Sequence, residues 1–102
     1  MNDEIEKELS ERIDEVLFYI WDPIGVNHYA QARDEYRAYV PRVLEAVRTD
    51  AGPEELIILL NQLAAGPMGL GSSEQLADRA RAAVETVFDW MELLNHRAAR
   101  EG

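Results

Sequence analysis

The sequence predicts an all-α protein, a compact bundle of about four helices in a single domain that covers residues 1–102. Three observations lead to this prediction. Apolar residues recur at spacings of three and four in several long segments, which is the period of an amphipathic helix. Proline, glycine, serine or asparagine stands where these segments begin and end. The chain is 47% hydrophobic and has no cysteine, so its core is expected to form without a disulfide or a zinc–thiolate site.

The first predicted helix covers residues 3–20. Asn2 or Asp3 is placed to cap its start, and acidic residues in the first turn suit the positive end of the helix dipole. The acids lie on the face opposite the apolar stripe. This stripe consists of Ile5, Leu9, Ile13, Val16, Leu17 and Ile20.

The stretch Trp21-Asp22-Pro23-Ile24-Gly25-Val26 ends this helix. Proline restricts the residue before it to extended conformations, so the helix should end near Trp21. Asp, Pro and Gly at the first, second and fourth positions indicate a type I turn. The Asp22 carboxylate is expected to accept a hydrogen bond from the N–H of Ile24 or Gly25. We interpret Trp21 and Asp22 as parts of a structured corner.

Residues 27–32 have no clear period and are predicted to form an ordered loop with one helical turn. A second helix is predicted over 34–50, with Asp34 as its cap and Pro41 in its interior. Either this helix is kinked, or a short helix over 34–39 is followed by the main one near Pro41; we favour one kinked helix. Gly52 is expected to supply a left-handed residue at its end. The predicted buried stripe is Tyr36, Val40, Val43, Leu44 and Val47.

The third helix is predicted over 53–65 and the fourth over 73–98. The third is apolar on almost every side, which suits either the central element of the bundle or a contact surface between two copies of the chain; we favour the first. Ser72 or Ser73 caps the fourth helix, and Ser72 has capping-box spacing to Gln75. The fourth stripe is Leu76, Ala80, Ala83, Val84, Val87, Phe88, Met91 and Leu94.

Two short motifs carry a resemblance to a known family. Trp21-Asp22-Pro23-Ile24-Gly25-Val26 and Asp34-Glu35-Tyr36, together with Tyr39, Glu54-Glu55-Leu56 and Met68-Gly69-Leu70, resemble a family of small bacterial helical proteins described as a domain of unknown function. The similarity spans about residues 17–70. It implies a compact helical fold and a bacterial cytosolic origin, and it implies no reaction.

The net charge of −10 is unevenly distributed, because residues 1–22 hold eight acids against Lys7 and Arg12. Such a surface repels nucleic acids and anionic membranes and attracts basic proteins. No segment has the length of a membrane span or the apolar core of a signal peptide, so a cytoplasmic protein is expected. The acids either recognise a partner or only keep the protein soluble. The candidate partner-binding residues are Glu4, Glu8, Glu11 and Glu15.

Constellations typical of catalysis are sparse in this chain. Asp89, Glu92 and His96 share one helix face, but the spacing of Glu92 and His96 is also that of an ordinary surface ion pair. His28 near Asp34 and Glu35 fits a metal or acid–base site less well than a simple loop histidine. The serines lack a supporting histidine. We therefore expect no catalytic residues, no metal and no cofactor.

The function predicted from these observations is that of a small acidic, non-enzymatic protein that binds a basic partner. An immunity protein, an antitoxin-like protein or a regulator would have this character. The alternative is a small-ligand-binding or weakly catalytic domain that uses the 21–39 region. The residues proposed for that alternative site are Trp21, His28, Asp34, Glu35, Tyr36 and Tyr39.

Overall fold

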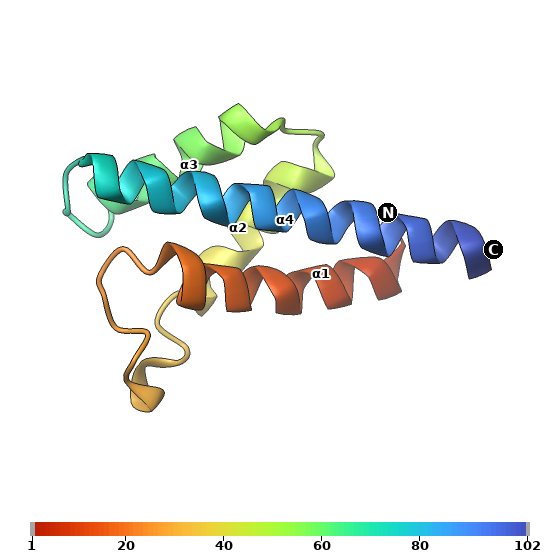
Figure 1. Ribbon diagram of the computed structural model, residues 1–102, viewed down its shortest axis with the longest axis horizontal. Coiled ribbons are helices and arrows are strands. Elements are labelled where there is room, and N and C mark those ends of the chain that lie inside the picture. The colour runs from red at the N-terminus through yellow and green to blue at the C-terminus, as the bar shows by residue number, and fades with distance from the viewer. Residues whose placement is uncertain (1, 102) are drawn as a thin grey trace.

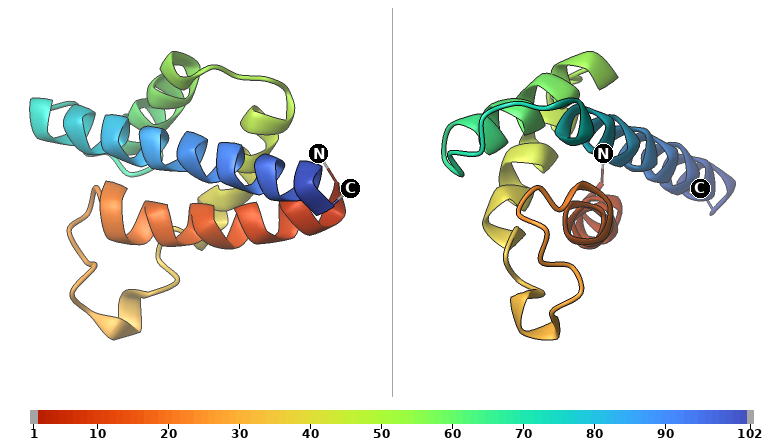
Figure 2. Two further views of the ribbon diagram at one scale, coloured as in Figure 1. Left: turned by 45° about the vertical axis from the view of Figure 1, so that its right-hand side comes forward. Right: turned by 60° about the vertical axis from the view of Figure 1, so that its left-hand side comes forward.

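The structure is a computed structural model that describes residues 2–101, so Met1 and Gly102 of the predicted domain lie outside the described part of the chain. The all-α prediction is confirmed. α1 and α4 run side by side in opposite directions, and the start of α1 and the end of α4 lie at the same end of the bundle (Figures 1 and 2). The bundle is flattened, with extents of 44 × 30 × 18 Å. Its helices are α1 (Asp3–Val16), α2 (Val40–Arg48), α3 (Pro53–Ala65) and α4 (Glu74–Glu101).

The central element is α4, which packs against both α1 and α3. Its buried face includes Ala80 and Ala83, whose small side chains let the neighbouring helices approach closely. The prediction that the third helix is central is wrong. α3 packs mainly on α4 and less on α2, so part of its surface faces solvent and Ile58 is 54% exposed.

The first helix begins as predicted, because Oδ1 of Asn2 accepts a hydrogen bond of 2.8 Å from the N–H of Ile5. α1 then continues into a π-helical turn, η1 (Leu17–Trp21), and the helical segment ends at Trp21. A π-turn holds more residues than an α-turn and therefore rotates the side chains that follow it. Phe18 and Trp21 are buried as a result, whereas Ile20 of the predicted stripe is only partly buried.

The predicted single kinked helix over 34–50 is wrong, and the alternative with two segments is closer to the structure. A 3₁₀ turn, η3 (Arg37–Tyr39), leads directly into α2, which starts at Val40. Pro41 thus stands in the first turn, where its missing N–H has no intrahelical partner to lose. Asp34 is exposed and does not cap α2, whose N-cap position is Tyr39 without a side-chain bond.

The connection between α2 and α3 also differs from the prediction. Asp50, with φ of 62°, is the left-handed residue, whereas Gly52 is extended with φ of −79°. The N–H of Ala51 donates to the carbonyl of Ala46 at 3.0 Å, and that of Asp50 donates to Val47 at 3.3 Å. This is the Schellman pattern, in which glycine or asparagine usually occupies the left-handed position.

The remaining elements agree closely with the sequence. α3 has its predicted bounds, and a 3₁₀ turn, η2 (Ala30–Ala32), is the expected helical turn of the loop. At the start of α4, the Ser73 hydroxyl accepts from the N–H of Leu76 at 3.1 Å, so Ser73 and not Ser72 is the cap. Within residues 2–101, none of the helices combines the length and the apolar character needed to cross a membrane.

Candidate functional site

The two motifs that carry the family resemblance meet through the buried side chains of Asp22 and Tyr36. The Tyr36 hydroxyl donates a hydrogen bond of 2.7 Å to Oδ1 of Asp22. The carboxylate also accepts from the N–H of Val26 at 2.9 Å and of Asn27 at 3.1 Å. The predicted closure onto the turn is therefore present, but the donors differ from those expected: the N–H of Ile24 bonds to the Tyr36 hydroxyl at 3.0 Å instead.

The backbone of Asp22 is held as firmly as its side chain. Its φ of 32° and ψ of 61° are left-handed, so the predicted extended conformation is wrong. The carbonyl of Asp22 accepts from the N–H of Gly25 at 3.1 Å, which closes the expected turn. Nη1 of Arg79 donates to the same carbonyl at 2.9 Å and thereby connects α4 to the corner. These contacts stabilise a conformation that a non-glycine residue rarely adopts.

Tyr36 and Trp21 form the buried floor of this corner. Trp21 is 0% and Tyr36 is 1% exposed, and their ring centroids are 5.6 Å apart. Burial, together with the hydrogen bond to Asp22, raises the pKa of the Tyr36 hydroxyl above its usual value. The hydroxyl therefore stays protonated near neutral pH and acts as a donor, not as a base. The environment of Trp21 and Asp22 agrees with their interpretation as structural residues.

The alternative ligand site over residues 21–39 is divided between the interior and the surface. Trp21 and Tyr36 are buried, whereas His28, Asp34 and Glu35 are exposed. Tyr39 is partly buried against the core. The residues predicted to share one site thus lie in different environments, and the hydroxyl of Tyr36 is already engaged with Asp22.

Most of the candidate partner-binding glutamates on α1 contact arginines of the same chain. Glu8 lies 3.4 Å from Arg97 of α4. Glu11 and Glu15 lie 3.6 Å and 3.3 Å from Arg12, whose guanidinium carbon is 5.4 Å from the centroid of the Trp90 ring. Glu4, the remaining member of the group, is exposed. The acidic charge of this face is therefore partly balanced within the protein.

Asp89, Glu92 and His96 line a shallow surface cavity of about 360 Å³ on α4, together with Leu93. The predicted ion pair between Glu92 and His96 does not form in the described part of the chain. Among the described residues, no group of three or more histidine or carboxylate side chains is arranged to hold a metal ion.

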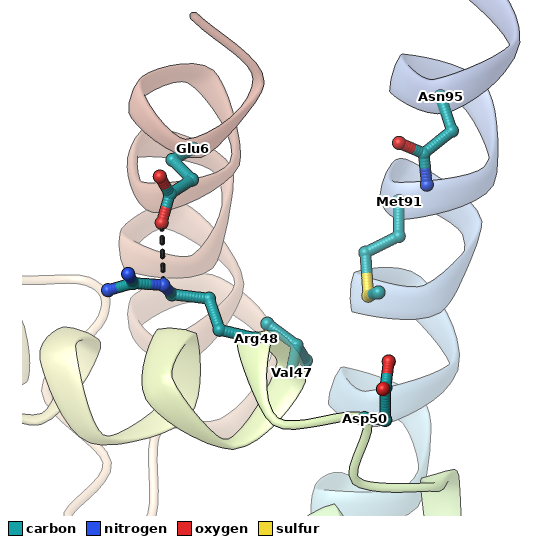
Figure 3. Close-up of a pocket in the computed structure, with 6 residues that line it drawn as sticks. All are labelled: Glu6, Val47, Arg48, Asp50, Met91 and Asn95. Carbon is teal, nitrogen blue, oxygen red and sulfur yellow. Dashed lines mark ion pairs between the residues drawn. The ribbon is translucent and has the colours of Figure 1, made fainter. Parts of the chain in front are cut away.

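A second cavity, of about 400 Å³, lies between α1, the end of α2 and α4 (Figure 3). On one wall, Oε1 of Glu6 pairs with Nε of Arg48 at 2.8 Å, and Arg48 also lies 3.5 Å from Glu45. In the view of Figure 3, Asp50 stands at the end of α2 below Met91 and Asn95 of the facing helix. The lining residues are Glu6, Val47, Arg48, Asp50, Met91 and Asn95.

Sequence reasoning does not identify this cavity. In the sequence pattern, Val47 and Met91 are only members of apolar stripes, and Asp50 is only part of a turn. Asn95 is 45 positions from Asp50, so no local pattern connects them. One signal is present in the chain: an aspartate stands directly after the last turn of a helix, where acidic side chains are electrostatically unfavourable.

Comparison with known proteins finds no match to a protein-family model, a curated protein or a solved structure. The resemblance carried by the Trp-Asp-Pro-Ile-Gly and Asp-Glu-Tyr stretches therefore stays a prediction. What the chain itself provides is a corner tied together by buried polar groups, and an open cavity bordered by acidic side chains.

Proposed function

We propose that the protein is a non-enzymatic binding protein whose acidic surface docks a basic protein partner. One observation carries this proposal: most arginines of the chain already form ion pairs with carboxylates of the same chain. Only ten residues are basic against twenty acidic ones, and six arginines pair with carboxylates of the same chain. These are Arg12, Arg33, Arg37, Arg48, Arg81 and Arg97.

The outward charge that remains is strongly acidic, and its clearest row lies on α4. Glu85, Asp89 and Glu92 follow one another at spacings of four and three, so they share one helix face. All three are exposed. α1 is the less available surface, since three of its four candidate glutamates contact arginine. A basic partner would gain more from the α4 row because it would not have to displace an existing ion pair.

An immunity protein, an antitoxin or a small regulator in a bacterial cytoplasm would act in this way. Such a protein needs a stable scaffold and a charged face, and it needs no reactive group. Complementary charge raises the rate of encounter and discriminates against wrong partners more than it raises affinity alone. Binding by this mechanism weakens at high ionic strength because salt screens exposed charges.

The first prediction compares two charge reversals in affinity capture from a bacterial lysate, identified by mass spectrometry at low and high salt. We expect Glu85→Lys/Asp89→Lys/Glu92→Lys to abolish capture of a basic protein that the natural sequence retains only at low salt. Reversal of Glu4, Glu8, Glu11 and Glu15 to Lys should leave capture largely intact. Loss of capture only in the α1 variant would contradict the α4 row and show that the glutamates of α1 bind the partner.

Circular dichroism of both reversed proteins checks that the helical fold survives. Capture that persists undiminished in both variants would show that these acids only solubilise the protein. Capture that is insensitive to salt would equally contradict an electrostatic partner.

A further inference from the structure

We propose that the cavity between α1, α2 and α4 binds an aliphatic ammonium group, the side chain of a lysine on the basic partner. The inference rests on the proposed function for the source of the lysine. The cavity itself can be tested with a small probe that needs no partner. Its position is shown in Figure 3.

The charge of the cavity selects a cation. Glu6 and Asp50 each contribute a carboxylate, and Arg48 contributes the single positive charge. That charge is already shared between Glu6 at 2.8 Å and Glu45 at 3.5 Å. An incoming anion would have to compete with both glutamates for Arg48. A cation instead meets Asp50, whose carboxylate forms no ion pair within the described residues.

The position of Asp50 strengthens this argument. It lies just beyond Thr49, the C-cap residue of α2, at the negative end of the helix dipole, where a carboxylate is unfavourable and a cation is stabilised. Its backbone is left-handed, a conformation that glycine or asparagine would adopt at lower cost. An ammonium group bound at Asp50 would be attracted both by the carboxylate and by the negative end of the α2 dipole.

The remaining lining suits the methylene chain of a lysine. Val47 and Met91 provide apolar surface, and the flexible thioether of methionine adapts to a thin aliphatic chain. The amide oxygen of Asn95 offers a neutral acceptor for a second N–H of the ammonium group. In Figure 3, Met91 lies between Asn95 and Asp50. Ligand cavities commonly measure about 300–1,000 Å³, so about 400 Å³ is ample for one side chain.

The cavity also borders the acidic row of the proposed docking face. Asn95 follows Glu92 by three residues on α4, so the two side chains are neighbours on the helix surface. A basic segment that lies along Glu85, Asp89 and Glu92 could therefore direct one lysine into the cavity. The row would supply long-range attraction, and the cavity would supply recognition of shape and chemistry.

The test is an NMR titration of the protein, residues 1–102, with N-acetyl-lysine methylamide. We expect the amide signals of Val47, Asp50, Met91 and Asn95 to shift in a saturable manner. The neutral analogue N-acetyl-norleucine methylamide should bind about tenfold more weakly, because it cannot form a charge-assisted hydrogen bond. Free n-butylamine should compete with the lysine probe, which shows that the ammonium group and its chain are what the cavity recognises.

Asp50→Asn is the decisive variant because asparagine is well tolerated in the left-handed conformation. The variant should fold and melt close to the temperature of the natural sequence, and its affinity for the lysine probe should fall about tenfold. Glu54→Gln is the matched control: it removes one exposed negative charge outside the cavity and should change the affinity less than twofold. This pair separates a local contact from an effect of net charge.

The outcomes distinguish the cavity from the proposed function. Equal affinity of Asp50→Asn and the natural sequence, or the absence of shifts at the cavity, would overturn the inference even if basic proteins are still captured by the α4 row. Lysine binding that depends on Asp50 would support the cavity as an ammonium site. If no basic protein were then captured at low salt, the docking function and the partner as the source of the lysine would both fail.

Discussion

Asp22 and Asp50 adopt the same unusual backbone conformation in opposite surroundings. Both have positive φ, 32° and 62° respectively, and both follow the last turn of a helical segment. Asp22 is 3% exposed, and its carboxylate accepts hydrogen bonds from two backbone N–H groups and one tyrosine hydroxyl. Asp50 is exposed and lines an open cavity.

This difference shows that a strained residue can have two quite different roles. At Asp22, the surrounding contacts account for the conformation, because the carboxylate must sit where it can satisfy the loop. At Asp50, the backbone pattern alone would be served better by glycine, so the side chain is the feature that calls for an explanation. We therefore interpret the first region as a structural corner and propose the second as a ligand site.

The largest expected effect tests whether the Asp22 corner is structural. Trp21→Ala should lower the free energy of unfolding by about 3–5 kcal/mol, since it removes a fully buried ring. Trp21→Phe should cost clearly less, because it keeps an aromatic ring and deletes an indole N–H that has no partner in the described structure. Chemical denaturation measures both changes. A stable Trp21→Ala protein that has lost its partner would instead make the corner a functional site.

A sharper test applies the same chemical change to both aspartates. Asp22→Asn should destabilise the protein by about 1–3 kcal/mol. Both carboxylate oxygens of Asp22 accept hydrogen bonds, whereas an amide has only one accepting oxygen and would leave a donor without a partner. Asp50→Asn should have an effect within about 0.5 kcal/mol or be slightly stabilising, as expected for an exposed position. Thermal and urea unfolding compare the two. Equal effects would mean that burial does not separate these residues as we infer.

The smallest expected effect is confined to alkaline solution and concerns Tyr36. The pKa of its hydroxyl is raised by burial and by the Asp22 hydrogen bond, so the folded protein retains a proton that the unfolded chain loses above about pH 10. Stability should therefore be unaffected by this group below that pH and should fall above it, by up to about 1.4 kcal/mol per pH unit.

Tyr36→Phe serves as the control for this alkaline loss. The variant should be less stable at neutral pH, because it removes the bonds to Asp22 and Ile24. Its stability should then decline less steeply between pH 10 and 11 than that of the natural sequence. Urea unfolding monitored by circular dichroism at each pH gives the comparison. Parallel curves for the two proteins would contradict the raised pKa.

Several elements could be predicted because their signals are local. The bounds of α3 follow from Pro53 and from the glycine after the helix, and Asn2 and Ser73 are caps whose partners lie three residues away. Elements that depend on distant contacts were predicted less well. Pro41 lies in the first turn of α2, so the helix starts there instead of continuing through a kink. The stripe of apolar residues fits either arrangement and does not distinguish them.

By itself, the sequence determined the helical class, the approximate extents of the helices, the presence of a turn after Trp21 and the acidic character of the surface. Periodicity, caps and charge all act over a few residues, so they can be read without a structure. The tertiary structure alone decided that Tyr36 and Arg79 hold Asp22, and that Asp50 and Asn95 line the same cavity. These arrangements depend on how α4 packs against α1 and α2, and that packing joins residues whose separation along the chain carries no local signal.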